Sequence, residues 1–318
     1  MNLPLLTPDL HARLTNSDGT VRRLALIELA ELEDEDLVPW LLQALQDPEP
    51  DVRTEAAERL AYWEQDATVQ ALVQSLEDPV SAVREAAAHS LSELKLVSAG
   101  PWLLPAVEHA DAFVRASALR ALRELRVPES YLPALQSLDD ADSRVRLEAV
   151  GVLGWLKQEG ALSGLAWVAQ HDEQAEVRRA AVGALGFASS DNVLPALLAA
   201  VTDQTWQVRE EAATTLGKLK LPGALDALIL ALEDAYWQVR QRAVRALGQL
   251  RATKAVPAVV SLLAHTIVNL RKEAVIALGE IRDPSALSAL DKALVDPDPE
   301  VRKVARLAVS QIEAVSKA

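Results

Sequence analysis

The sequence contains no cysteine among its 318 residues. The chain therefore has no means of forming a disulfide, a thiolate metal site or a cysteine nucleophile. It also lacks an uninterrupted apolar run of about 18 residues, the length that a membrane span needs. The N-terminal segment MNLPLLTPDLHARL has neither the basic start nor the apolar stretch of a signal peptide. We therefore expect a soluble, cytoplasmic protein with no membrane span.

Aromatic and basic residues are also scarce. Aromatics make up 4% of the chain although half of all residues are apolar, a balance typical of packed helices rich in Ala and Leu. The net charge is −14, which disfavours nonspecific binding of nucleic acid. Residues 1–100 hold 7 Lys and Arg against 19 Asp and Glu, whereas residues 201–318 hold 16 against 14. One end of the chain is therefore strongly acidic and the other mildly basic.

A repeat runs through the whole chain. A Val-Arg or Leu-Arg pair recurs every 31 residues, with one interval of 32, and begins at Val21, Val52, Val83, Val114, Val145, Val177, Val208, Val239, Leu270 and Val301. Each pair is followed by Ala four residues later and by Leu, or once Val309, eight residues later. These positions share one face of a helix, so they predict a buried stripe on a second helix.

An apolar segment before each pair predicts a first helix, so each unit is a helix–turn–helix. One such unit cannot bury its own apolar face, and neighbouring units must stack. The pattern predicts an all-α fold, an α-solenoid with a right-handed superhelix, in one domain over residues 1–318. The ten expected repeats cover 5–32, 36–63, 67–94, 98–125, 129–156, 160–188, 191–219, 222–250, 253–281 and 284–312.

The turn between the two helices carries a second conserved pattern of charge within the chain. Five residues before the Val stands an Asp in seven repeats, replaced by Asn16, His109 and His265 in the others. An Asp can accept backbone N–H bonds at this turn, and His can cap the helix or point to solvent, with a pH-sensitive role as the alternative. Because Asp and Arg recur with the unit, we expect a ladder of charge-assisted bonds. Its predicted members are Asp47, Arg53, Asp78, Arg84, Asp140, Arg146, Asp172, Arg178, Asp203, Arg209, Asp234, Arg240, Asp296 and Arg302.

The pattern V-R-x-x-A-x-x-x-L, preceded by the turn Asp, resembles HEAT repeats along the entire chain. The short unit is similar to the HEAT-like repeats named after phycobilisome bilin lyases. This resemblance implies a solenoid that binds other proteins, with phycobiliproteins as possible partners and a bilin as a transient ligand. In such lyases the acceptor cysteine belongs to the substrate protein, so the absence of Cys here is compatible with that activity.

The sequence offers little self-contained chemistry. None of the five histidines precedes a Glu, unlike the His-Glu pairs that hold iron in HEAT-like hydroxylases, and they are widely spaced. No glycine elbow surrounds a Ser, and the glycines nine residues after the repeat Val are helix-packing positions. We expect no catalytic residues, no metal and no resident cofactor.

Residues that break the repeat on the exposed face are the candidates for partner binding. Trp206 and Trp237 replace mostly small residues at the same position of adjacent repeats and should form an aromatic platform with cations beside it. The alternative is that they cover apolar surface. The candidates are Trp206, Trp237, Tyr236, Arg242, Arg245, Lys272, Arg179, Trp155 and Phe187, of which the last and Trp155 could instead shield a seam between repeats.

Two further features have simple structural interpretations. The acidic run from Glu31 to Asp36 is expected to be a solvated connector, with docking of a basic partner as the alternative. Trp40, Trp63 and Trp102 fall in apolar helical stripes and are expected in the core. Two functions remain open at this point. The first is a scaffold or chaperone that holds a partner along the second helices, and the second is a bilin lyase or lyase-like factor.

Overall fold

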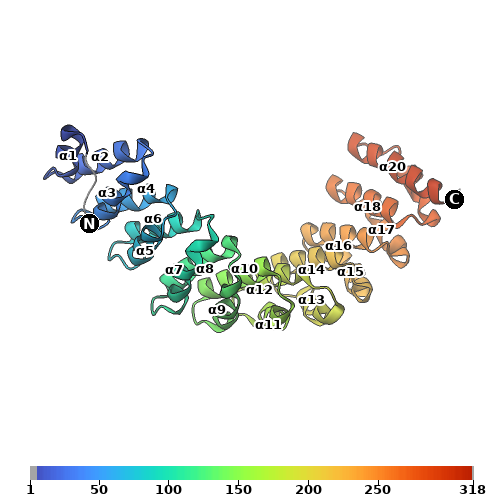
Figure 1. The fold of residues 1–318 in the computed structure, drawn as a ribbon. Helices are drawn as coiled ribbons and strands as arrows, with labels where there is room; N and C mark the ends of the chain where they lie inside the picture. The colour runs from blue at the N-terminus through green and yellow to red at the C-terminus, as the bar shows by residue number, and fades with distance from the viewer. Residues whose placement is uncertain (1–5, 317–318) are drawn as a thin grey trace. The chain divides into compact units, whose positions relative to one another are not determined.

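The computed structural model describes residues 6–316 and, within them, twenty α-helices arranged as ten pairs and no strand. Residue 5, where the first repeat was expected to begin, lies outside the described residues. The chain divides into two compact units, one up to Lys157 and the other from Gln158 onward, with five helix pairs in each. Figure 1 shows the order of the helices within each unit.

The first unit alternates first and second helices, most of them joined by short 3₁₀ turns. Its helices are α1 (Pro8–Leu14), α2 (Gly19–Glu31), α3 (Val38–Ala44), α4 (Pro50–Arg59), α5 (Asp66–Ser75), α6 (Ser81–Ser92), α7 (Gly100–Leu103), α8 (Ala112–Leu125), α9 (Tyr131–Gln136) and α10 (Ser143–Leu156). The second helices, which have even numbers, pack on one another in sequence from α2 to α10.

The second unit repeats this arrangement. Its helices are α11 (Leu162–His171), α12 (Ala175–Ala184), α13 (Leu194–Ala200), α14 (Trp206–Leu219), α15 (Leu225–Leu230), α16 (Trp237–Gln249), α17 (Val256–Ser261), α18 (Val268–Ile281), α19 (Leu287–Ala293) and α20 (Pro299–Ser316). The second helices α12, α14, α16, α18 and α20 again pack side by side (Figure 1). Each therefore presents its remaining face away from the core.

The periodic stripe forms the core of both units. Each of the ten alanines, from Ala25 to Ala305, is at most 1% exposed, because it lies where a second helix meets its neighbours. The stripe is less complete at its N-terminal end. Leu32 is 56% exposed although the pattern placed it on the buried face, because α2 ends at Glu31 and only one neighbouring repeat packs on it.

Glycine brings the second helices of the second unit unusually close. A Cβ added to Gly217 would lie 2.9 Å from the Cα of Ala246, and one added to Gly248 would lie 2.9 Å from the Cα of Ala277. Gly279 has the same relation to Ala308, at 3.0 Å. These glycines therefore act as helix-packing positions, as the sequence indicated. They hold α14, α16, α18 and α20 together near their C-terminal ends.

Candidate functional site

The repeated Arg and Asp form an Arg–Asp ladder that joins six pairs of neighbouring repeats. In it the guanidinium of one repeat donates from Nε and Nη2 to both carboxylate oxygens of the turn Asp in the following repeat, at 2.6–3.0 Å. The pairs are Arg22–Asp47, Arg53–Asp78, Arg115–Asp140, Arg178–Asp203, Arg209–Asp234 and Arg271–Asp296. Arg22, Arg115 and Arg271 were not among the predicted ladder members. Each lies 25 residues before the Asp that it binds, and this constant separation in the sequence could have identified them.

Each turn Asp also shapes its own repeat. One carboxylate oxygen of Asp140 accepts the backbone N–H of Asp142 at 2.8 Å, and the carbonyl of Asp140 accepts a bond from Arg146 Nη1 at 2.8 Å. The carboxylate of Asp172 accepts the N–H of Gln174 at 2.9 Å in the same way. Arg302, in the last repeat, bonds the carbonyl of Asp296 at 2.6 Å. One Asp thus caps its own turn and binds the preceding repeat.

The expectation of ladder bonds does not hold for Arg84 and Arg240. The Nε atom of each is buried and has no hydrogen-bond partner among the described residues. The cause is the next turn, where histidine replaces Asp. His109 Nδ1 accepts the N–H of Asp111 at 3.1 Å, and His265 Nδ1 accepts that of Ile267 at 3.0 Å. The imidazoles cap their turns but supply no carboxylate to the preceding repeat.

An aromatic pair lies at the N-terminal ends of α14 and α16. The rings of Trp206 and Tyr236 are stacked, with centroids 5.4 Å apart and planes inclined by 13°. Tyr236 is 46% exposed, and the Arg209 guanidinium lies 5.7 Å from its ring centroid. Trp237 begins α16, is half-buried, and makes no ring contact with Trp206. Tyr236, the residue before the helix, therefore takes the place beside Trp206 that was expected for Trp237.

Two of the four expected cations around this pair are engaged within the protein. Arg242 Nε lies 3.1 Å from the carboxylate of Glu210, and Arg245 Nη2 lies 2.6 Å from that of the buried Glu273. Both guanidinium groups therefore bind carboxylates on neighbouring second helices.

The other two predicted cations lie on different second helices of the same unit, Arg179 on α12 and Lys272 on α18. Arg179 is exposed and Lys272 is half-buried, and neither forms an ion pair within 4 Å among the described residues. Burial raises the pKa of Glu211, and the charge of Arg179 opposes this effect. These two cations are the part of the predicted set whose charge is open to a partner.

The remaining predicted aromatics lie in different units. Trp155, in the first unit, is 43% exposed, and the Arg126 guanidinium lies over its ring at 4.7 Å. Phe187, in the second unit, is half-buried in the 3₁₀ turn Leu185–Phe187. Of the tryptophans expected in the core, Trp40 and Trp63 are buried. Trp102 is 38% exposed because α7 is a single short turn that leaves it at the surface.

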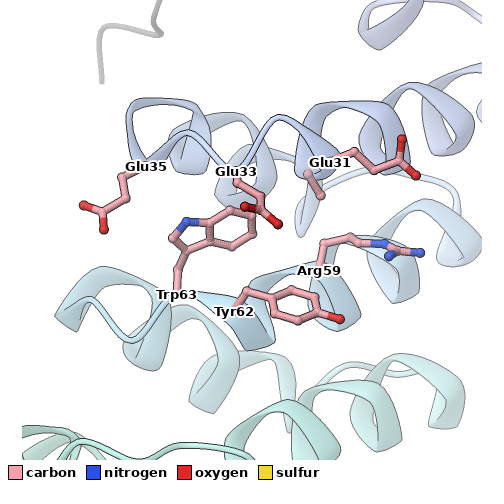
Figure 2. Close-up of a pocket in the computed structure, with 7 residues that line it drawn as sticks. Glu31, Glu33, Glu35, Arg59, Tyr62 and Trp63 are labelled. Carbon is pink, nitrogen blue, oxygen red and sulfur yellow. The ribbon is translucent and has the colours of Figure 1, made fainter.

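The first unit contains an acidic cavity of about 450 Å³ lined by Ala30, Glu31, Glu33, Glu35, Arg59, Tyr62 and Trp63. Figure 2 shows Glu31 at the end of α2 with Glu33 and Glu35 beyond it, facing Arg59 at the end of α4 and the two rings that follow it. Residues 31–36 are all exposed, as expected of a solvated connector. The Arg59 guanidinium lies 2.6 Å from Glu55, so its charge is already balanced outside the cavity.

Other kinds of site find no support in the described residues. No group of three or more His, Asp or Glu side chains is placed to hold a metal ion within residues 6–316. No helix in this part of the chain is both long and apolar enough to cross a membrane.

The geometry defines a class of protein, a solenoid of stacked helix pairs, and the all-α solenoid predicted from the sequence is confirmed. The family model of HEAT repeats matches residues 7–92, 55–123, 100–186, 162–234 and 225–310. The chain therefore belongs to the HEAT-repeat family. No curated protein sequence matches it. It is similar in fold to an engineered protein whose crystal structure comes from the Northeast Structural Genomics Consortium, with 22% identity, a TM-score of 0.57, and coverage of 96% of this chain and 98% of that one.

Proposed function

We propose that the protein is an interaction scaffold that binds a partner protein through the second helices, with the Trp206–Tyr236 pair as an anchor. HEAT repeats commonly serve as such scaffolds, and the described residues offer no cluster suited to a metal. The observation that carries the proposal is the stacked, partly exposed pair at the start of α14 and α16. Aromatic side chains dominate binding energy at protein interfaces because they bury a large area with little loss of conformational freedom.

The surroundings of the pair also suit a protein partner. Arg209 orders the Tyr236 ring from its place in the ladder, so the stack is preorganised before a partner arrives. Arg179 and Lys272, on neighbouring second helices of the same unit, leave positive charge for acidic groups at the edge of an interface. In this proposal Trp237 and Phe187 contribute further contact area, while Trp155 belongs to a separate contact in the first unit.

The second candidate is a bilin lyase or lyase-like factor, to which the resemblance of the short repeat points. A bilin carries propionates, and Arg242 and Arg245 were the residues expected to neutralise them. Both guanidinium groups are bound to Glu210 and Glu273, so a bilin would have to displace these carboxylates. The geometry therefore favours a protein partner, and the lyase function stays a prediction.

The experiment compares the wild type with a double variant in which Trp206 and Tyr236 are replaced by Ala. Purified protein would capture partners from its native lysate, followed by measurement of the affinity for the main captured protein. We expect a loss of about 30-fold for each ring and roughly 1000-fold for the two together, because anchors of this type contribute about 2 kcal/mol or more each. The unfolding free energy should change by less than the 3–5 kcal/mol typical of a truncated core indole.

Trp167 supplies the matched control. Its ring is exposed on the first helix α11, where it stacks on His171, so Trp167→Ala removes a stacked surface indole outside the proposed interface. This variant should keep the wild-type affinity. An unchanged affinity of the double variant would place the contact elsewhere. A new absorbance band after incubation of the wild type with a bilin would favour the lyase function instead.

A further inference from the structure

Three cations recur at one position of successive repeats in the second unit, and the sequence analysis did not single them out. Lys220, Arg251 and Arg282 each stand twelve residues after the repeat Val or Leu, just beyond the second helix. Their φ angles are 52°, 50° and 60°, so all three have the left-handed conformation that often ends a helix. All three side chains are exposed.

The packing of the helices brings these cations into one row. Gly217, Gly248 and Gly279 allow α14, α16, α18 and α20 to approach closely near the ends from which the cations extend. Between them lies a groove of about 200 Å³ lined by Lys220, Gly248, Gln249, Arg251, Glu280, Arg282 and Gln311. We call it the cation groove. Its position at the C-terminal ends separates it from Trp206 by the length of α14, roughly 20 Å at 1.5 Å per residue.

The cations of the groove form no ion pairs with the described residues. Neither Lys220 nor Arg251 nor Arg282 has a carboxylate within 4 Å in the part of the chain that the structure describes. The one acid that lines the groove is Glu280, against three cations, so the lining has a net positive charge. This contrasts with the ladder arginines and with Arg242 and Arg245, whose partners lie within the protein.

A cation at a helix end does not by itself indicate a binding site. A positive side chain is favoured near a helix C-terminus by the helix dipole. Glu33, however, occupies the same repeat position in the first unit with a φ of 50° and carries the opposite charge. The backbone position therefore accepts either sign. In the first unit Lys95, Arg126 and Lys157 form a similar run, and the Arg126 guanidinium lies over the Trp155 ring. What distinguishes the second unit is that its three cations line one groove with a net positive charge, which suits an anionic partner.

We propose that the cation groove binds an extended acidic segment of a partner protein, with carboxylates at every third residue. Neighbouring packed helices lie about 8–10 Å apart, and an extended chain of the polyproline II type has three residues per turn and advances about 3.1 Å per residue, so every third side chain lies on the same face. Three residues of the segment therefore match one repeat of the solenoid. Gln249 and Gln311 supply amide N–H groups for the carbonyls of the bound segment. This surface acts independently of the Trp206–Tyr236 anchor.

The test uses a fluorescein-labelled 12-residue peptide with Glu at every third position and Ser and Gly between. Its affinity for the full-length protein would be measured by fluorescence anisotropy at low and at physiological salt. We expect binding that weakens with salt, as for exposed charge pairs. Two comparison peptides have the same Glu residues gathered in one block, or Gln in place of Glu. Both should bind more weakly than the spaced peptide.

The decisive variant replaces Lys220, Arg251 and Arg282 by Gln. This removes the positive charges and keeps an unbranched side chain at each left-handed backbone position. It should lose about tenfold in affinity, since exposed pairs contribute modestly and add up. The matched control replaces Lys254, Lys292 and Lys303 by Gln, which makes the same change in net charge on exposed side chains outside the groove. This control, the Arg251→Lys, Arg282→Lys variant and the Trp206→Ala, Tyr236→Ala variant should all bind as the wild type does.

Several results would overturn the proposal. Two results would show that the binding is nonspecific electrostatic attraction. One is equal affinity for the spaced peptide and for the peptide with its Glu residues in one block. The other is a loss of affinity in the Lys254, Lys292 and Lys303 control equal to that in the groove variant. Tighter binding of polyphosphate than of the spaced peptide would assign the groove to a different polyanion. Tighter binding of a peptide spanning residues 29–38 would indicate self-association through the acidic run. A lowered melting temperature of the Gln variant with unchanged peptide affinity would leave the cations a role in helix stability alone.

Discussion

Two neighbouring junctions in the first unit show what the ladder does. Where the fourth repeat meets the fifth, Arg115 donates to both oxygens of Asp140, at 2.8 and 2.9 Å. Where the third repeat meets the fourth, the corresponding Arg84 has a buried Nε without a hydrogen-bond partner, and its guanidinium lies 5.4 Å from the centroid of the Phe113 ring. The second unit contains the same contrast between Arg209–Asp234 and Arg240–His265.

The difference separates two tasks of the turn residue. His109 performs the first task, because its Nδ1 caps the turn as the Asp carboxylate does. It does not perform the second, which is to bind the Arg of the preceding repeat. Capping is therefore a local property that Asp, Asn or His can provide, whereas the bond between repeats requires a carboxylate. The predictions below test how much stability depends on that second task.

The largest expected effect is loss of the whole ladder in acid. Burial raises the pKa values of Asp47, Asp78, Asp140, Asp203 and Asp234, but bonds from the ladder Arg and the turn amide lower them further, to a net value below the usual range. For Asp296 the bond from Arg271 lowers the pKa most. The unfolded chain then binds more protons than the folded one around its own pKa of about 3.9.

The sign of the pH dependence follows from these lowered pKa values. The ladder contributes its full stability above about pH 5, and this is lost as the pH falls below about 4 and through the folded-state values. We expect the melting temperature to fall by on the order of 10 °C between pH 6 and pH 3. Circular dichroism melts at constant ionic strength would measure it. A melting temperature that is the same at both pH values would contradict a stabilising ladder.

The next effect is the loss of a single complete junction. Asp140→Ala removes the carboxylate that binds Arg115 and the acceptor of the Asp142 N–H, and leaves a largely buried guanidinium without its partner. We expect the unfolding free energy to fall by about 2 kcal/mol. Urea denaturation would measure the change. Asp139→Ala is the control, since Asp139 is exposed and adjacent, and a similar loss in both variants would show that the ladder bond itself matters little.

Much of the fold could be predicted from the sequence, because the periodic Val, Ala and Leu of each repeat identify the buried face of the second helix. The partner of each ladder Arg was harder to assign, because it depends on how one repeat stacks on the next and not on the spacing within a repeat. For the same reason the pairing of Arg242 with Glu210 and of Arg245 with Glu273 was missed. Trp102 was placed in the core because its stripe assumed a longer helix than the single turn of α7. The cation groove was missed because the sequence analysis considered the buried and exposed faces of the helices and not the residues that follow their C-terminal ends.

The smallest expected effect is the repair of an incomplete junction. His109→Asp places a carboxylate at the turn position that Asp occupies in seven other repeats, with the same spacing to Asp111 that Asp140 has to Asp142. The new carboxylate should accept from the buried Nε of Arg84 and still cap the turn. The exposed contact of His109 Nε2 with Glu77, at 3.4 Å, is lost. We expect a gain of about 1 kcal/mol in the unfolding free energy, and the same for His265→Asp with Arg240.

Asparagine at the same position separates the two tasks. Asn16 occupies the turn of the first repeat, where its side-chain oxygen accepts the N–H of Asp18 at 2.9 Å, so His109→Asn should keep the cap. It offers Arg84 a neutral acceptor in place of a carboxylate, and we expect it to gain less than half of what His109→Asp gains, because a charged acceptor forms the stronger bond. Urea denaturation at pH 7 would compare the two variants with the wild type. If Asn and Asp stabilise the protein equally, the gain comes from the cap, and the ladder bond is not what distinguishes the complete junctions from the incomplete ones.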